Sequence, residues 1–177
     1  MKIGLIRHSR VINDKILLST GKIFEQSRIR YDSAPIELVL LKIKSEDYPV
    51  CYASSKTRAR QTAKMIYEGN IIICDDLIEV PNSTFFLLRV PLPSFLRALI
   101  GRIAWFFNYH KMPETRKQST ARAQRFINML LSETKENALI VTHGFFMQCL
   151  QRDLKKRGFK GDISYFPKNA KLYTLKK

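Results

Sequence analysis

Short apolar runs alternate with longer amphipathic stretches along the 177-residue chain. The runs at residues 3–6 and 139–141 are continuous, which is typical of strands buried on both faces of a mostly parallel sheet. The pattern predicts, in order, strand 2–8, a helix near 35–47, strand 49–53, helix 56–68, strand 71–75, an insertion at about 80–117, helix 118–133, strand 138–142, helix 145–157 ending at Gly158, and strand 170–176. This alternation predicts an α/β fold, a three-layer α/β/α sandwich with a mostly parallel central sheet.

Two histidines directly follow predicted strands. Arg7-His8 closes the first strand, and His143-Gly144 follows strand 138–142. A lone histidine at a strand end is often only a hydrogen-bonded structural residue. Because ligands of parallel sheets bind at the carboxyl ends of the strands, the two histidines together predict one shared site.

A third polar segment follows strand 49–53 and reads Ser-Ser-Lys-Thr-Arg-Ala-Arg-Gln-Thr-Ala over residues 54–63. It is typical of a helix start, with serine as a candidate N-cap and Arg58 in the first turn. Free backbone N–H groups at such a start favour an anion. From these residues alone, Arg58 and Arg60 could equally belong to a solvated basic helix face.

Together the three blocks resemble the histidine phosphatase superfamily, the phosphoglycerate mutase-like enzymes. The family's Arg-His-Gly is similar to Arg7-His8-Ser9, its Ser-x-x-x-Arg-Ala-x-Gln-Thr block fits residues 54–62, and its late His-Gly fits His143-Gly144. Looser likenesses extend the resemblance over nearly the whole chain. They are a Leu-x-Glu at residues 77–79, the spacing of Glu114 and Arg122, and Asn169-Ala170.

The chain departs from the family pattern near the first histidine. Ser9 replaces a glycine, so the backbone there either suits serine or is strained. Asp14 stands where many members have asparagine, and the resemblance assigns substrate binding to Asn13 instead. Thr20 and Gly21 are further substrate-binding candidates, because some mutases have a substrate-contacting Ser/Thr-Gly there, and Gly144 completes the set.

Phosphoryl transfer needs a nucleophile and compensation for the charge on the equatorial oxygens. A neutral imidazole is a competent nucleophile near neutral pH, because its unperturbed pKa is about 6.5. His8 is therefore the predicted nucleophile. Arg7 and Arg58 carry planar forks that match phosphate geometry and stay charged at any working pH.

The reaction also needs a proton for the leaving alkoxide. The resemblance gives this role to Glu79, which would protonate the leaving oxygen and then activate water. Glu114 is the alternative acid, and Glu79 could instead be an ordinary surface carboxylate. His143, held protonated by the bound anion, would be a third positive donor.

The resemblance implies a phosphatase that needs no metal or other cofactor and hydrolyses a small or medium phosphomonoester through a phosphohistidine. A phosphoglycerate mutase-type phosphotransferase, a protein phosphohistidine phosphatase and a non-catalytic phosphate-ligand binder remain alternatives. Other catalytic patterns fit poorly. Six residues separate Cys51 from Arg58, against five in the cysteine phosphatase loop, and the sequence has no zinc, Walker or dinucleotide-binding motif.

Length and composition suit one domain over residues 1–177, with 45% hydrophobic residues. Three cysteines, an odd number in or beside apolar runs, favour reduced thiols over a disulfide framework. The first apolar stretch is too short for a signal peptide, so a cytoplasmic location is expected. The oligomeric state stays open.

The insertion at about 80–117 corresponds to the family's cap over the phosphate site. Residues 85–107 combine Phe85, Phe86 and other apolar residues with three arginines and no acidic residue. This cap could pack on the domain, or it could make weak contact with an anionic membrane surface. The net charge of +16 should attract anionic substrates, whereas no motif predicts specific nucleic-acid binding.

Overall fold

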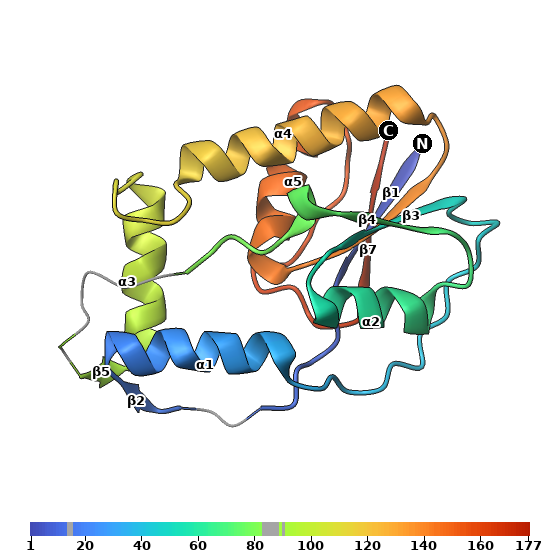
Figure 1. Ribbon diagram of the computed structural model, residues 1–177. Coiled ribbons are helices and arrows are strands. Elements are labelled where there is room, and N and C mark those ends of the chain that lie inside the picture. Colours follow the sequence, from blue (N-terminus) through green and yellow to red (C-terminus); the bar gives the residue numbers. More distant parts are fainter. Residues whose placement is uncertain (14–15, 83–88, 90) are drawn as a thin grey trace.

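The computed structural model describes residues 1–13, 16–82, 89 and 91–177. Its elements in chain order (Figure 1) are β1 (Lys2–Arg7), β2 (Leu18–Ser19), α1 (Gly21–Ser33), β3 (Val50–Ser54), α2 (Thr57–Ile66), β4 (Ile71–Cys74), the 3-10 helix η1 (Asp75–Leu77), β5 (Leu92–Pro93), α3 (Ser94–Phe106), α4 (Arg116–Glu133), β6 (Ala138–Thr142), α5 (Gly144–Lys156) and β7 (Leu172–Lys176). The five predicted strands and the predicted helices of α2, α4 and α5 are confirmed to within a few residues.

Five strands form the central sheet in the order β4-β3-β6-β1-β7. Neighbouring strands are parallel except for β7, which runs antiparallel to β1. In the register of β1 and β6, Arg7 lies opposite Thr142. The predicted mostly parallel sheet is therefore confirmed, and the carboxyl ends of β1, β3 and β6 lie side by side.

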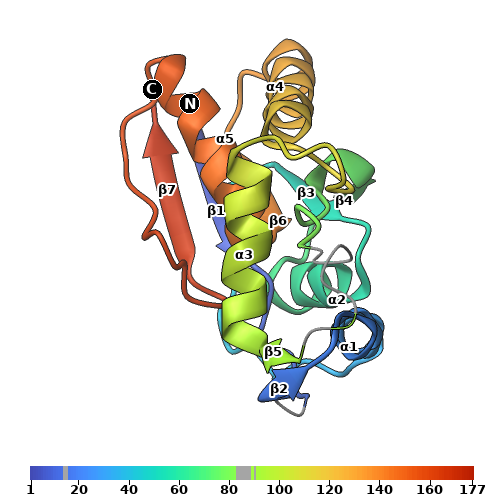
Figure 2. The same cartoon turned by 90° about the vertical axis from the view of Figure 1, so that its left-hand side faces the viewer.

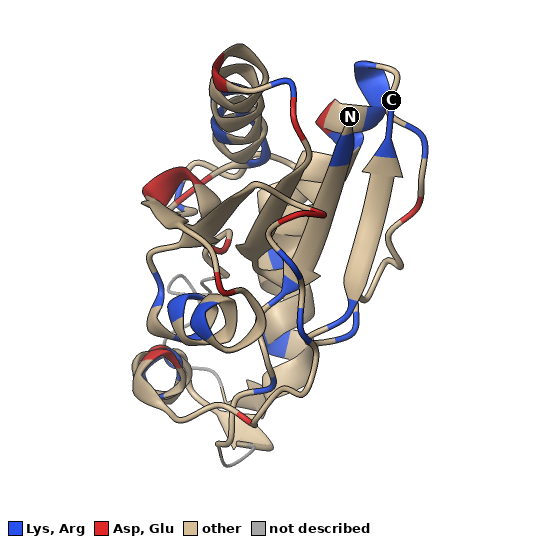
Figure 3. Cartoon of the chain, turned by 90° about the vertical axis from the view of Figure 1, so that its right-hand side faces the viewer, with Lys and Arg blue, Asp and Glu red and all other residues tan. Residues whose placement is uncertain are grey.

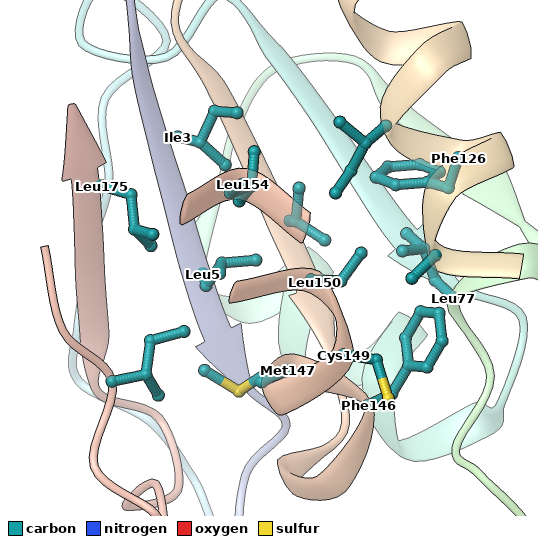
Figure 4. Close-up of a cluster of buried hydrophobic side chains, with 14 of the residues drawn as sticks. Ile3, Leu5, Leu77, Phe126, Phe146, Met147, Cys149, Leu150, Leu154 and Leu175 are labelled. Carbon is teal, nitrogen blue, oxygen red and sulfur yellow. The ribbon is translucent and has the colours of Figure 1, made fainter. Parts of the chain in front are cut away.

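One face of the sheet is covered by α4 and α5. Ile3 and Leu5 of β1 belong to the same buried cluster as Phe126 of α4 and Leu150 and Leu154 of α5, as Figure 4 shows. Apolar side chains in this cluster are removed from water almost completely, and burial of this kind is the main favourable contribution to folding.

The other face is covered by α2 and by an irregular segment at residues 35–48, so the helix predicted near 35–47 is wrong. Side chains there alternate between the two sides of an extended chain: Val39 and Leu41 pack against the core, whereas Leu38 and Leu40 are exposed. A period of two belongs to an extended chain. The run of apolar residues was dense enough to resemble a helix in the sequence, and tertiary packing decided otherwise.

A smaller lobe lies beyond the carboxyl ends of the strands and consists of α1, α3 and the two-stranded ribbon of β2 and β5 (Figures 1 and 2). Helix α1 was not predicted. It starts at Thr20, whose hydroxyl accepts a hydrogen bond from the Ile23 amide at 3.4 Å. Helix α3 lies within the predicted insertion, whereas Phe85 and Phe86 are outside the described residues.

Local sequence signals explain where α4 begins and where α5 ends. Thr115 and Gln118 form a capping box at the start of α4, in which each side chain bonds the other's backbone amide. Helix α5 ends just before Gly158, which has a φ of 89° that favours glycine. Among the helices described, none is both long and apolar enough to cross a bilayer.

Candidate active site

Three adjacent strand ends bring the sequence blocks together. His8 follows β1, Ser54 ends β3, and His143 follows β6 as the N-cap of α5. The imidazole rings of His8 and His143 lie 5.0 Å apart between centroids. The structure therefore brings the two histidines side by side at the strand ends.

The hydrogen bonds of His8 show which ring nitrogen carries the proton. Nδ1 lies 2.6 Å from the Ser9 carbonyl oxygen, which can only accept, so Nδ1 carries the proton. Nε2 in turn accepts a hydrogen bond from Nε of Arg58 at 3.2 Å. Burial and the adjacent Arg58 lower the pKa of His8 to about 3, so the ring is neutral near pH 7 and Nε2 has a lone pair.

Ser9 fits its position without strain. Asn108 and Ala170 are the only non-glycine residues with a positive φ in the described part of the chain. The Ser9 amide donates to the Thr62 hydroxyl at 2.8 Å, and its own hydroxyl donates to the Glu37 carbonyl at 2.7 Å. The family's glycine is therefore replaced by a residue whose side chain ties the loop after β1 to the segment at residues 35–48.

His143 is fully buried behind His8. Its Nε2 shares a hydrogen bond of 2.9 Å with the Ser54 hydroxyl, and its Nδ1 has no hydrogen-bond partner within the described residues. Burial, and then the neighbouring His8 and Arg58, lower the pKa of His143 well below its usual value. Without a bound anion the ring is therefore neutral. The protonated His143 predicted from the sequence applies only to the site with an anion bound.

Arg7 lines the cavity at His8, and a backbone carbonyl holds the end of its guanidinium group. One terminal nitrogen donates to the Pro167 carbonyl at 3.0 Å, whereas Nε is buried without a partner among the described residues. Gly144 makes this approach possible, since a Cβ there would lie 3.1 Å from Nε of Arg7. Gly144 therefore contributes by leaving room for the guanidinium.

Arg58 is held by two residues of α1 that sequence reasoning missed. Its guanidinium forms an ion pair with Asp32 and lies over the ring of Tyr31, with 5.1 Å between its central carbon and the ring centroid. Asp32 also pairs with Lys56 at 2.6 Å. Burial alone would raise the pKa of Asp32, but the hydrogen bonds from Lys56 and Arg58 bring it below its usual value. No motif marked these residues, because α1 itself was not predicted.

The Glu79 carboxyl group lies at the start of α5 and lines the cavity at His8. Its carboxyl group accepts from the Val80 amide at 2.9 Å, the Phe146 amide at 3.0 Å and the Phe145 amide at 3.3 Å. In this arrangement the group accepts hydrogen bonds. A role as proton donor requires protonation, for which Oε2, with a single amide contact, has a lone pair left.

Glu114, the alternative acid, is placed differently. Both of its oxygens accept from Arg122, at 2.9 and 2.8 Å, and Arg122 also donates to the carbonyls of Asp76 and Ile78. The pair thus fixes the chain just before Glu79. Glu114 itself is not among the residues that line the cavity at His8.

The remaining predicted residues lie around this centre. Asn13 lines a neighbouring cavity, not the one at His8. Thr20 and Gly21 form the start of α1 and line neither of these two cavities. Asn169 donates to the His8 carbonyl at 2.7 Å and so holds the backbone of the histidine.

A cavity of about 280 Å³ opens over His8. Its described charged lining residues comprise five cations and two carboxylates: Arg7, Arg28, Lys56, Arg58, Arg102, Asp32 and Glu79. Basic positions also recur along α2 and around the lower strand ends in Figure 3. The arrangement can hold a dianionic group against a neutral imidazole nitrogen. Among the described residues, no cluster of three or more metal-ligating side chains occurs.

Comparison with known proteins defines the class. The family model of the histidine phosphatase superfamily (branch 1) matches residues 35–176. The chain belongs to this superfamily. A comparison with curated proteins found no significant relative.

Solved structures share the fold at low identity. The chain superposes on the product of an open reading frame from Mycobacterium tuberculosis with a TM-score of 0.56 and 15% identity, covering 98% of this chain and 89% of that one. A phosphoserine phosphatase from Entamoeba histolytica in complex with 3-phosphoglyceric acid gives a TM-score of 0.55, 16% identity and the same coverages of 98% and 89%. The alpha-ribazole phosphatase from Shigella flexneri gives 0.51 and 20% identity, covering 99% and 95%. These likenesses show the fold alone.

Proposed function

We propose that the protein is a phosphatase that hydrolyses a phosphomonoester through a phosphohistidine at His8. One observation carries the proposal: Nε2 of His8 keeps its lone pair while Nδ1 is held by a carbonyl, inside a cavity whose described lining has three more cations than carboxylates. A histidine nucleophile requires a fixed tautomer next to cations that bind the phosphate, here called the cationic cradle, Arg7 and Arg58.

The first step forms a bond between Nε2 of His8 and phosphorus, and breaks the bond between phosphorus and the ester oxygen. Arg7 and Arg58 compensate the charge on the equatorial oxygens, so this charge needs no metal ion. His143 would take up a proton from solvent when the negative charge of the bound dianion favours it, and would then be a third donor. The leaving alkoxide takes a proton from Glu79, the carboxyl group in the cavity that is not already paired with a basic side chain.

In the second step water attacks the phosphohistidine. The bond between Nε2 and phosphorus breaks, Glu79 takes the proton of the attacking water, and inorganic phosphate leaves. His8 returns to its neutral form with the proton on Nδ1. The enzyme is thus regenerated without a cofactor.

Hydrolysis of p-nitrophenyl phosphate in the presence of a chelator tests this proposal. Turnover should persist with the chelator and fall by several powers of ten in His8→Ala, because the covalent route is lost. His110→Ala is the matched control, since His110 is an exposed residue outside the cavity lining. Retention of more than about a tenth of the activity in His8→Ala would remove His8 as the nucleophile.

Two further measurements, with phosphoglycerate as substrate and with phosphate or vanadate as ligand, separate the alternatives. A phosphotransferase of the mutase type would convert phosphoglycerate isomers faster than it releases phosphate. A protein that only binds phosphorylated ligands would show no turnover, while phosphate or vanadate would still bind at Arg7 and Arg58.

A further inference from the structure

A second cavity of about 380 Å³ adjoins the one at His8. The two share Phe24, Arg28 and Tyr31, which recur at intervals of four and three residues on one face of α1. The Tyr31 ring lies 6.5 Å from the His8 ring between centroids. A molecule bound with its phosphate at His8 can therefore extend along α1 into the second cavity.

The lining of this second cavity is mostly apolar. Its described lining residues are Asn13, Ile16, Leu17, Phe24, Ser27, Arg28, Tyr31, Ser94 and Phe95. None of them is a carboxylate, and the one cation, Arg28, pairs with Glu25 at 2.8 Å. Leu17 and Phe95 stand at the edge with 83% and 75% of their surface exposed. An exposed leucine and phenylalanine beside an open cavity indicate an apolar occupant.

We infer that this second cavity binds the leaving group of the substrate, and that this group is apolar. The inference rests on the proposed function and names its substrate class: a phosphomonoester of an alkyl or aryl alcohol, as opposed to a small ester with a second charged group. The phosphate occupies the cationic cradle, and the apolar part lies between α1 and the start of α3.

A homologous series of alkyl phosphates tests the substrate class. kcat/KM should rise by about fourfold per methylene from methyl to hexyl phosphate, which follows from the burial of each added group. Phosphoserine and 3-phosphoglycerate should be poorer substrates than hexyl phosphate. A flat series, or a preference for the two charged esters, would overturn the inference.

Two variants at the edge of the second cavity test whether the dependence of kcat/KM on alkyl chain length arises there. Leu17→Ser and Phe95→Ser should each reduce the gain in kcat/KM from methyl to hexyl phosphate, because the cavity edge loses apolar surface. Leu99→Ser is the matched control, because Leu99 lies on α3 but outside the lining. If p-nitrophenyl phosphate turnover still depends on His8 while the alkyl series is flat, only the leaving-group assignment fails.

A separate observation concerns α3, which exposes a row of large apolar side chains. Its inner face carries Arg97, which is fully buried and donates to the Ser19 carbonyl at 3.0 Å, together with Gly101 and Trp105. Its outward side chains are large and apolar: Phe95, Leu99, Ile103 and Phe106, followed by Phe107. In Figure 2 this helix stands in front of the molecule. The exposure of these side chains shows that no described part of the chain covers them.

The charges around α3 favour an anionic occupant of this face. Of the five lysines and arginines in residues 91–117, Arg97 is buried on the inner face and Arg102 lines the cavity at His8. The other three, Lys111, Arg116 and Lys117, are at least partly exposed, and the one carboxylate in this range, Glu114, is paired with Arg122. The Arg116 guanidinium lies over the Phe106 ring at 4.4 Å from its centroid, at the edge of the apolar face. A second copy of this chain would bring another net charge of +16 against the first, whereas an anionic bilayer complements it.

We propose that the outer face of α3 docks on an anionic membrane surface. The apolar side chains would enter the boundary between headgroups and acyl chains, with the basic residues at the headgroups, as for other interfacial helices. Leu17 and Phe95 lie at the mouth of the second cavity, so that mouth would open towards the bilayer.

Sedimentation with lipid vesicles tests the docking. The full chain should bind vesicles that contain phosphatidylglycerol much better than vesicles of phosphatidylcholine alone, and binding should weaken as salt is raised. The double variant Leu99→Ser/Ile103→Ser should lose about tenfold or more in affinity, from the apolar surface that it no longer buries. Its turnover of p-nitrophenyl phosphate without vesicles should be unchanged.

Leu40→Ser is the matched control, because Leu40 is 96% exposed on the segment at residues 35–48. It should bind vesicles like the unmodified protein. Equal binding by the double variant would show that charge alone attracts the protein. A concentration-dependent dimer that the double variant abolishes would show a second copy as the occupant. Either result would overturn the docking.

Discussion

The two buried histidines should make the protein sensitive to mild acid. Both have pKa values below that of an unfolded histidine, which is about 6.5, and His8 reaches about 3. Below pH 6.5, His8 and His143 become protonated in the unfolded chain, whereas both stay neutral in the folded protein. The stability contributed by the neutral rings is therefore complete above pH 6.5 and is lost as the pH falls towards the folded-state values.

The size of the effect follows from proton linkage. Between pH 7 and pH 5, His8 with its pKa of about 3 should cost about 2 kcal/mol of unfolding free energy, and His143, whose pKa is also lowered, should add a loss of the same sign. Domains of this size are stable by only about 5–15 kcal/mol, so the loss is large. Asp32, whose pKa is lowered, contributes to acid sensitivity only in a more acidic range.

Urea unfolding at pH 7, 6 and 5, in buffers without phosphate, measures this loss. His8→Asn should remove about 2 kcal/mol of the pH dependence between pH 7 and 5, and His143→Asn should also reduce it. His110→Asn should remove little, because His110 is exposed. A loss below about 1 kcal/mol in the unmodified protein, or the same loss in all three variants, would refute the buried neutral pair.

Three further changes probe the site. Gly144→Ala places a Cβ 3.1 Å from Nε of Arg7, so vanadate should bind several-fold more weakly as an inhibitor of p-nitrophenyl phosphate turnover, with little change in thermal stability. Glu79→Gln should slow alkyl phosphates by about 10²–10⁴-fold but p-nitrophenyl phosphate far less, since its leaving group hardly needs a proton; equal losses would make Glu79 structural. Asp32→Asn removes the ion pair that orients Arg58, so KM should rise more than kcat falls, and an unchanged KM would contradict the positioning role.

The strands and the residues at their ends were predictable because local pattern and tertiary structure agree there. Continuous apolar runs define β1 and β6, and parallel strands necessarily bring His8 and His143 to the same edge. The role of Arg58, in contrast, was predicted from the family resemblance, because its own segment also suited a solvated helix face. At the carboxyl ends of these parallel strands, the position of a residue in the sequence determines which side chains it meets.

Other parts depend on contacts that no local pattern encodes. The segment at residues 35–48 resembled a helix because its apolar residues are dense, but it packs in extended form on the sheet. Helix α1 has a mostly polar sequence, and its functional face points into a cavity, so periodicity gave no signal. Asp32 and Tyr31 were missed for that reason, although they hold Arg58 in place.

The most direct test of the central claim is to trap the covalent intermediate. The protein is mixed with a phosphate-labelled substrate and quenched in alkali, because phosphohistidine survives alkali and is lost in acid. Peptide mapping should then find the label on His8, and no label in His8→Ala. Label on Cys51, or full turnover by His8→Ala without any trapped label, would contradict the phosphohistidine route.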